Sequence, residues 1–325
     1  MNRSLSCTVR AFPVLPAAEG RAFHCPAPRG QAWPALTILL IAACDASAYA
    51  RAGATTLVDD ADRIVAVDSP ALRIVSLLPS VTELIVALDA ADRLLIRTEY
   101  DADARLAHLP SFGRTLSPSA EALIQLRPDL VIRGTERGMG GGAPVDALGL
   151  REYVADVQTI EDIGVMVDRL GVLLGLPERA DSLRTSLEHG LAAVRAAVGS
   201  RPRPTVLYLI WPYPPQTAGP GTFIDQLITA AGGRNVFADL RIQWPQVSLE
   251  EIVRRDPDYV VMPQNGASGA AMPSIRNAPG WRTLGAFREG HIVFVESDLF
   301  NRPGARVVEA ARLLAEVLHP EVQLR

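Results

Sequence analysis

The sequence predicts an α/β fold made of two similar halves that one long helix joins. The first observation is a repeat: SAEALIQLRPDLVI at 119–132 and SLEEIVRRDPDYVV at 248–261 share their Ser, Glu, Pro and Asp and the spacing of their apolar residues. The second is that each half places an apolar strand, a polar turn and a helix in the same order, which is the unit of an open parallel sheet. The third is a helical pattern over 178–198, between the halves.

The first half begins with a predicted hairpin and a strand–turn–helix unit. Residues 56–69 alternate apolar and polar side chains around an Asp-rich turn, which indicates a small hairpin. Residues 74–77 form a short apolar strand, and Leu78-Pro79-Ser80 forms the turn. We expect a helix from about Val81, with Ser80 or Thr82 as its N-cap.

The two copies of the repeat predict a helix followed by a buried strand. In each, a serine caps the helix, a glutamate occupies its first turn and Pro-Asp ends it. These residues are Ser119, Glu121 and Pro128-Asp129 in the first copy, and Ser248, Glu250 and Pro257-Asp258 in the second. Glu251, three residues after Ser248, also predicts a capping box.

The second half restarts after Pro202 and Pro204, which end the long helix. A strand is predicted at 205–210, a Pro- and Gly-rich loop at 211–223 and a helix that ends on glycines at 223–233. We therefore expect an N-terminal α/β lobe over 56–175, a linker helix over 176–200 and a C-terminal α/β lobe over 201–325.

Residues 1–50 have the pattern of a leader segment for export. The stretch PALTILLIAACDASAYA at 34–50 is apolar and then ends in small residues, as a secretory h-region and its cleavage site do. Its apolar run is too short to span a bilayer, which takes roughly 20 apolar residues. Ile41-Ala42-Ala43-Cys44 resembles a lipobox, in which Cys44 is lipidated, whereas Ala48-Tyr49-Ala50 fits ordinary cleavage, and both alternatives stay open.

Composition and motifs exclude several classes. The net charge is −4 and no basic run occurs, so we expect no nucleic-acid partner. All three cysteines (Cys7, Cys25 and Cys44) lie in the leader, which excludes a disulfide framework or a Cys-rich zinc site from the rest of the chain. The Gly-rich segment 138–144 lacks phosphate-loop spacing and indicates a loop.

No catalytic motif is present. The sequence lacks GxSxG and HExxH and, after the leader, any cysteine nucleophile. His108, His189, His291 and His319 lie far apart in different predicted elements. We therefore predict no catalytic residue, no resident metal and no cofactor.

The aromatic residues gather in loops next to strands. Trp211 and Tyr213 directly follow the predicted strand 205–210, and Trp244 precedes the second copy of the repeat. Ligands of open α/β sheets bind outside the carboxyl ends of the strands, where an aromatic ring can stack on a flat ligand. Burial of these rings in the core is the alternative.

The repeated glutamates Glu121 and Glu250 have two explanations. A carboxylate in the first turn of a helix interacts favourably with the helix dipole, by about 0.3–1 kcal/mol. Equivalent carboxylates on two equivalent lobes also offer two negative points to a partner with two matching basic points.

Several stretches resemble the substrate-binding proteins of ABC importers for cobalamin, haem and ferric siderophores. RIVSLLPSVTELIVAL at 73–88 resembles the family's first strand and helix, and AEALIQLRPDLVI at 120–132 resembles its second. ESDLFNRPGARVVEAARLLAEVL at 296–318 resembles its C-terminal loop and helix. The likeness covers about 70–325 and is strongest, at 232–261, to the cobalamin-binding members.

This resemblance implies two Rossmann-like lobes joined by a single long rigid helix, with the ligand cleft between the lobes. It implies that Glu121 and Glu250 pair with arginines on the two permease subunits. Together with the aromatic residues above, it also gives the expected ligand-binding residues. These are Pro79, Ser80, Tyr100, Trp211, Tyr213, Thr217, Gly219, Trp244, Phe300 and Arg302.

The chain departs from the cobalamin binders in its first lobe. Those proteins use tryptophans there, but no Trp lies between Trp33 and Trp211, and Thr115 and Gly134 stand near the expected positions. A corrinoid such as cobalamin is the expected ligand. Haem or a ferric siderophore is the alternative, with Tyr100 or a histidine on iron or with Arg302 on a carboxylate.

The expected function is therefore capture of a corrinoid outside the inner membrane and its delivery to an ABC permease dimer with its ATPase subunits. We expect an exported monomer, either periplasmic or held to the membrane by a lipid on Cys44. Its stiff linker helix predicts lobe closure of only a few degrees. An exported enzyme on the same two-lobed scaffold, or an exported interaction protein, is the alternative of another class.

Overall fold

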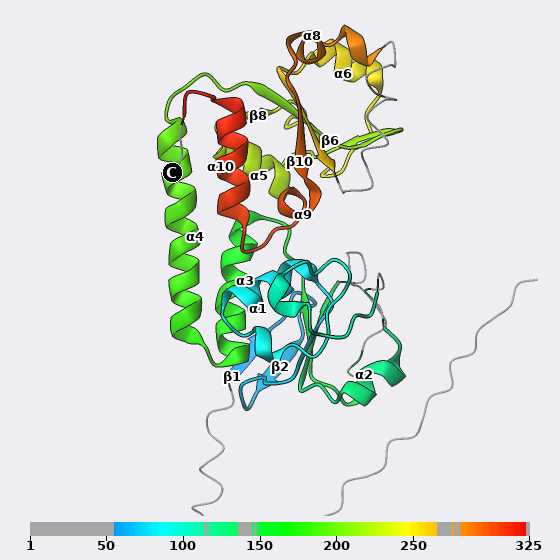
Figure 1. Ribbon diagram of the computed structural model, residues 1–325, viewed down its shortest axis with the longest axis vertical. Coiled ribbons are helices and arrows are strands. Elements are labelled where there is room, and N and C mark those ends of the chain that lie inside the picture. Colours follow the sequence, from blue (N-terminus) through cyan, green and yellow to red (C-terminus); the bar gives the residue numbers. More distant parts are fainter. Residues whose placement is uncertain are drawn as a thin grey trace, which may run out of the picture. The chain divides into compact units, whose positions relative to one another are not determined.

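The computed structural model describes residues 55–113, 116, 118–135, 145, 148–264, 275 and 280–322 (Figure 1). All of these belong to one compact unit, Gly53–Arg325. The predicted leader with Cys44, the Gly-rich segment 138–144 and Thr115 lie outside the described residues. Within the described ranges, no helix combines the length and the apolar character that a membrane crossing demands.

The first lobe contains a three-stranded parallel sheet in the order β3-β4-β5. Its strands are β3 (Ile74–Ser76), β4 (Leu130–Gly134) and β5 (Glu152–Ala155). Its helices are α1 (Pro79–Ala87), α2 (Ala120–Leu126) and α3 (Ile160–Leu174), with 3-10 turns at Ala91–Arg93 and Ala104–Leu106. The predicted hairpin is confirmed as β1 (Thr55–Val58) and β2 (Ile64–Val67), which pair antiparallel.

The second lobe carries a five-stranded sheet in the order β10-β9-β6-β7, with β8 also pairing with β6. Its strands are β6 (Thr205–Pro212), β7 (Pro215–Thr217), β8 (Arg234–Asn235), β9 (Tyr259–Gln264) and β10 (Ile292–Glu296). All pairs are parallel except β6 with β7. Its helices are α5 (Phe223–Ala230), α6 (Leu249–Arg255), α8 (Gly285–Glu289), α9 (Ser297–Phe300) and α10 (Val307–Leu318), with a 3-10 turn at Trp281–Thr283. Two mainly parallel sheets with helices confirm the predicted α/β class.

Helix α1 begins earlier than the sequence suggested. Pro79 occupies its first turn, where a missing N–H costs nothing, and Leu78 stands at the N-cap without a side-chain bond. The prediction of Ser80 or Thr82 as the cap is therefore wrong. Thr82 is buried instead, and its hydroxyl lies within hydrogen-bond distance of Ser76 Oγ and Leu78 O.

The two repeated helices have equivalent ends. Ser119 Oγ accepts a hydrogen bond from Ala122 N, and Ser248 Oγ accepts one from Glu251 N, which confirms both predicted caps. The predicted capping box at Glu251 is wrong, because its carboxylate accepts hydrogen bonds from Arg254 and Arg255 instead.

The repeated Pro-Asp ties each helix–strand unit to the neighbouring strand. The carboxylate of Asp129 accepts hydrogen bonds from Leu72 N at 2.8 Å and Arg73 N at 3.0 Å, just before β3. Asp258 accepts from the backbone N and the hydroxyl of Thr205, at 2.6 and 2.7 Å, where β6 begins. In both lobes the aspartate therefore aligns the start of one strand with that of its neighbour.

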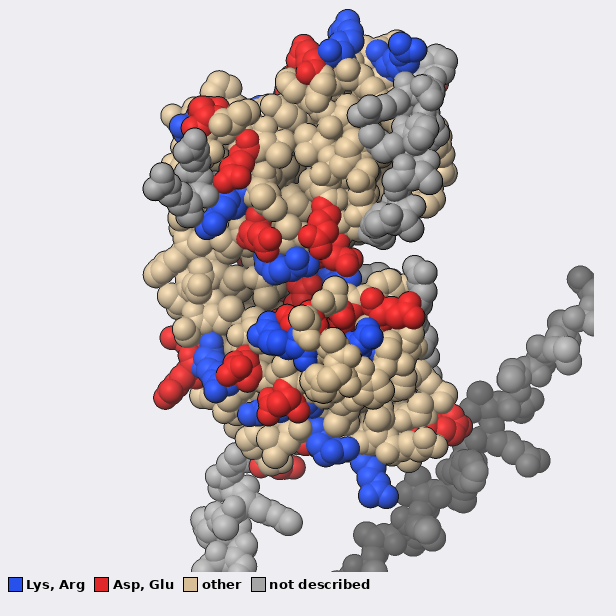
Figure 2. Space-filling view, in the orientation of Figure 1, with Lys and Arg blue, Asp and Glu red and all other residues tan. Residues whose placement is uncertain are grey.

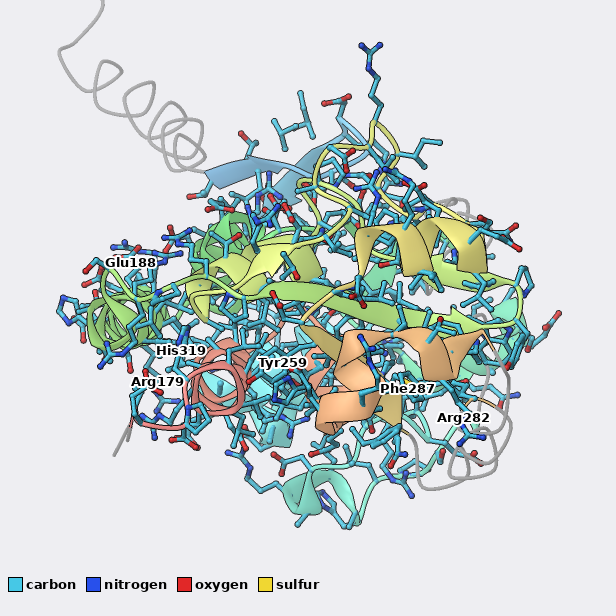
Figure 3. All side chains as sticks on the ribbon, turned by 90° about the horizontal axis from the view of Figure 1, so that it is seen from above. Arg179, Glu188, Tyr259, Arg282, Phe287 and His319 are labelled. Atoms are coloured by element: carbon cyan, nitrogen blue, oxygen red, sulfur yellow. The ribbon has the colours of Figure 1, made fainter. Side chains whose placement is uncertain are left out.

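The predicted long helix is α4 (Pro177–Val198), and it does not stand alone between the lobes. It packs against α3 of the first lobe and against α10 and α5 of the second. Figure 3 shows the α4–α10 contact from above, with Glu188 on α4 and His319 at the end of α10. One apolar core therefore runs through both lobes, from Ile74 in β3 through Leu187 and Leu191 in α4 to Val206 in β6.

Glycine allows α4 to approach its neighbours closely. A Cβ atom placed on Gly190 would lie 2.7 Å from Val308 Cγ1 in α10, and one on Gly171 in α3 would lie 2.6 Å from Ala180 Cβ in α4. Such distances are shorter than any packed carbon contact, so both helix pairs depend on the missing side chain.

We predict opposite effects for two Gly→Ala substitutions within helices. Gly190→Ala is expected to lower the free energy of unfolding by about 1–3 kcal/mol, because the methyl group overpacks the α4–α10 contact. Gly164→Ala in α3 is the matched control. Its Cβ would meet only Arg184 Cγ at 3.9 Å, so helix propensity should raise stability by up to about 1 kcal/mol. Urea denaturation measures both, and equal effects would contradict the packing argument.

Candidate functional site

A cavity of about 370 Å³ lies where strands of both lobes end. The first lobe contributes Gly134 and Thr135 at the end of β4 and Ala155 to Gln158 at the end of β5. The second contributes Ile210 near the end of β6 and the start of α5 at Phe223 and Ile224. The carboxyl ends of parallel strands are where open α/β sheets bind ligands, and the volume lies in the range of small-molecule sites.

The cavity wall is mostly apolar with a few polar groups. Among the described lining residues, Asp156 is the one ionisable side chain, and Ser80, Thr135, Gln158, Gln216 and Asn301 supply hydroxyl and amide groups. Asp156 is held near Gln158, whose amide donates to its carboxylate at 2.6 Å. Asn301 is oriented by the Tyr208 hydroxyl, which donates to it at 2.7 Å, and donates to Ser297 Oγ at 3.0 Å.

Of the ten predicted ligand-binding residues, the cavity brings together Ser80 and Trp244. Ser80 lies in the first turn of α1, next to the buried Pro79. Trp244 is 40% exposed and precedes α6. Since an indole that is still partly exposed beside a cavity has a face free for stacking, Trp244 is the strongest single contact candidate.

Trp211 and Tyr213 are exposed near this cavity without lining it, and Trp211 Nε1 donates to Tyr213 O. In the β6–β7 ladder Trp211 lies opposite Gln216, and Gln216 forms a bridge with Gln246. Side chains that lie opposite one another across paired strands share a face. The ladder is irregular between Leu209 and Trp211, and both Ile210 and Gln216 line the cavity, so Trp211 lies directly beside the cavity wall.

Three of the predicted contacts have structural roles. Thr217 is fully buried, and its hydroxyl donates to Tyr208 O at 2.8 Å. Phe300 packs in the core. Gly219 lets the segment before α6 approach, since its N–H donates to Gln243 O at 2.7 Å and a Cβ there would lie 2.0 Å from Ile242 O. None of the three lines the cavity, and ligand contact by any of them stays a sequence prediction.

Tyr100 and Arg302 also lie outside the cavity wall. Tyr100 is partly exposed, and its backbone N–H donates to Thr98 Oγ1. Arg302 is 8% exposed and pairs with Asp298 at 2.8 Å and with Glu83 of α1 at 3.2 Å. This arrangement does not offer the Arg302 guanidinium to a ligand carboxylate in the cavity, as the sequence had suggested.

The Arg302–Glu83 pair instead connects the two lobes beside the cavity. Arg306 adds a longer contact to Glu83, at 3.6 Å. Burial raises the pKa of the Glu83 carboxyl, although both arginines act to lower it. Asn301 and Pro303, on either side of Arg302, line the cavity. The ion pair therefore holds the segment that forms one cavity wall against α1, which forms another.

Glu121 and Glu250 occupy matching positions in the first turns of α2 and α6. Both are exposed, and no ion pair links either to another described residue. The pKa of each is lowered, chiefly by a hydrogen bond from the backbone at the residue itself and then by the hydroxyl of Ser119 or Ser248. The neighbouring Glu251 differs, because Arg254 and Arg255 pair with it and lower its pKa to about 2.

The site also contains residues that the sequence analysis missed. Asp156 and Gln158 follow β5, a short strand whose ends the sequence marks poorly, and Asn301 enters the wall through a turn after α9. The short apolar run Tyr153-Val154-Ala155 was the one available signal for β5. Among the described residues, no group of three or more His, Cys, Asp and Glu could hold a metal ion.

We predict a cooperative loss of stability when Arg302 loses both carboxylate partners. Glu83→Gln and Asp298→Asn each leave one partner, so each should cost about 1–2 kcal/mol of unfolding free energy. The double variant leaves a buried guanidinium without a carboxylate and should exceed the sum of the single effects by about 1 kcal/mol or more. Urea denaturation of the four proteins measures this coupling. Additive effects would show that the two pairs act independently.

Comparisons with known proteins agree with this geometry. A sequence model of the periplasmic binding protein family matches residues 74–299. The chain is 28% identical over 253 residues to a vitamin B12-binding protein of Photorhabdus laumondii, which covers 76% of this chain and 88% of the relative. It is 26% identical over 275 residues to YvrC of Bacillus subtilis, an uncharacterized ABC transporter substrate-binding lipoprotein, with 82% of this chain and 86% of the relative covered. Among solved structures it is similar to the periplasmic heme-binding protein RhuT of Roseiflexus, with a TM-score of 0.68, 26% identity, and coverage of 77% of this chain and 99% of that one.

Proposed function

Because the chain belongs to the periplasmic binding protein family, we propose that it is the exported substrate-binding component of an ABC importer and that its ligand is a corrinoid. The chain is a binding protein and not an enzyme, since the matching family and the relatives are periplasmic binding proteins. The alternative of an exported enzyme on this scaffold is thereby set aside. Its partners are an ABC permease dimer and the ATPase subunits.

The chemical groups in the cavity wall support the choice of a corrinoid as the ligand. The described wall residues offer an exposed indole face at Trp244, hydroxyl groups and side-chain amides, with a single carboxylate at Asp156. A corrinoid fits this set, because it has a broad macrocycle that an indole can stack on and amide arms that hydroxyl and amide groups can bind. A haem needs an iron ligand and cations for its carboxylates, and the candidates Tyr100 and Arg302 lie outside the described wall.

A corrinoid is larger than a cavity of about 370 Å³, so part of it would project from the open side. The exposed Trp211 follows the wall residue Ile210 directly and would meet this part. Trp244 would contact the inserted part, where less water competes.

We predict that the two tryptophans contribute unequally to ligand affinity. Trp244→Ala should raise the Kd for cobalamin by about tenfold or more, since a stacked, partly buried indole is typical of a binding hot spot. Trp211→Ala should raise it less than about threefold, because that ring stays exposed. Isothermal titration calorimetry with cobalamin, and separately with haem, measures both. Stoichiometric haem binding without cobalamin binding would reject the corrinoid and retain the importer role.

Glu121 and Glu250 are proposed as the groups that dock to the permease. They are ionised at neutral pH, equivalent in the two lobes and without cationic partners among the described residues. Two arginines of the permease, one on each subunit, would complement them.

We predict that the double charge reversal Glu121→Arg/Glu250→Arg lowers ligand uptake by more than about tenfold, because like charges then face each other across the interface. The Kd for the ligand should not change, since neither residue lines the cavity. Uptake into proteoliposomes that hold the cognate transporter measures the first effect, and calorimetry measures the second. Glu178→Arg, an exposed first-turn glutamate of the linker helix α4, is the control that should transport normally. Weaker ligand binding in the double variant, or equal uptake in all three proteins, would refute the docking role.

The lipid anchor on Cys44 and the alternative cleavage after Ala50 remain part of this proposal. A lipid on Cys44 would hold the protein at the outer face of the inner membrane, and cleavage after Ala50 would release it into the periplasm; in either place it can meet its permease.

A further inference from the structure

The segment that follows β5 is held from several sides where it borders the cavity. Asp156 N donates to Asp60 Oδ2 at 2.7 Å, in the turn between β1 and β2. Gln158 N donates to the Asp162 carboxylate at 3.0 Å, and Gln158 O accepts from Phe223 N at 2.9 Å, where α5 begins. Because partners from both lobes hold this backbone, Asp156 and Gln158 are positioned at the cavity before a ligand arrives.

The carboxylate of Asp156 has no cationic partner among the described residues. Carboxylates elsewhere commonly pair with arginines, as Asp60 does with Arg169 and Glu83 with Arg302. Figure 2 shows acidic and basic side chains side by side on the displayed face. By contrast, no ion pair joins Asp156 to another described residue, and the described lining of the cavity contains no Arg, Lys or His. Its negative charge is therefore uncompensated within the described wall.

One carboxylate oxygen of Asp156 is available to a ligand. Oδ1 accepts from Gln158 Nε2 at 2.6 Å. Oδ2 accepts from no described residue, and this oxygen of the partly exposed side chain is open to solvent. Since Nε2 of the exposed Gln158 side chain is turned to Asp156, its Oε1 is left as a second acceptor. This edge of the cavity therefore offers hydrogen-bond acceptors and one negative charge.

We propose that Asp156 determines specificity at this edge of the cavity: it accepts a hydrogen bond from a primary amide of the ligand and rejects a carboxylate in the same place. The inference rests on the corrinoid proposed above and adds a selection among corrinoids. A peripheral amide donates to Oδ2, whereas the carboxylate that forms on its hydrolysis has no proton to donate and meets a like charge. No cation in the described wall offsets that repulsion. The site therefore takes the fully amidated macrocycle in preference to acid forms of the same size.

The test compares the Kd of cobalamin with the Kd of each cobalamin monocarboxylate, in which one peripheral amide has been hydrolysed, by calorimetry on the full chain at neutral pH. At least one isomer should bind about tenfold or more weakly than cobalamin. Asp156→Asn replaces the charged acceptor by a neutral amide of equal size that can donate to the carboxylate. It should reduce the ratio of the two Kd values for that isomer to less than about threefold. Asp92→Asn, which removes an equal charge from an exposed turn outside the cavity, is the matched control and should keep the parent ratio.

Asp156→Ser is a second uncharged variant if Asp156→Asn does not fold, and the same loss of selection is expected. Equal binding of cobalamin and of every monocarboxylate by the parent chain would overturn the proposal and leave the corrinoid as the ligand. An unchanged ratio in a folded Asp156 variant would do the same. Absence of cobalamin binding would instead reject the corrinoid itself, and the selection with it.

Discussion

The packing of α4 against α3 and α10 is the contact on which the rest of the structure depends. It places helices from both lobes around one apolar core, so the lobes are not two bodies on a flexible tether. The absent side chains of Gly171 and Gly190 bring the helix backbones together. A change in the angle between the lobes must disturb this core, and close-packed cores resist small displacements.

The cavity follows from this arrangement, because part of its wall lies where the segment after α9 meets α1. Asn301 and Pro303 line the cavity, while Arg302 between them turns to Glu83 and Asp298. A single short segment therefore contributes a wall to the proposed ligand site and an ion pair between the lobes.

Local patterns in the sequence predicted the α/β class, the hairpin, the long helix and the serine caps of the repeat, because each depends on residues close together in the chain. Such local patterns could not predict contacts between different segments of the chain. The burial of Thr217 depends on Tyr208, and the pairing of Arg302 depends on Glu83, which is far away in the sequence. Glu251 failed as a capping residue because two nearby arginines compete for its carboxylate. Ser80 and Trp244 were predicted as site residues because both adjoin turns that the sequence marks clearly. Asp156 was missed because it follows β5, a strand whose ends the sequence marks poorly.

The aspartates Asp129 and Asp258 have a consequence for the proposed docking to a permease. Each fixes its repeat unit to the start of the adjacent strand, so Glu121 and Glu250 are held by backbone on the two sheets rather than by mobile loops. The distance between the two carboxylates is therefore set by the spacing between the lobes. In the docking proposed above, a permease that binds both at once would have to match this one spacing, because the shared core of the lobes resists a change in it.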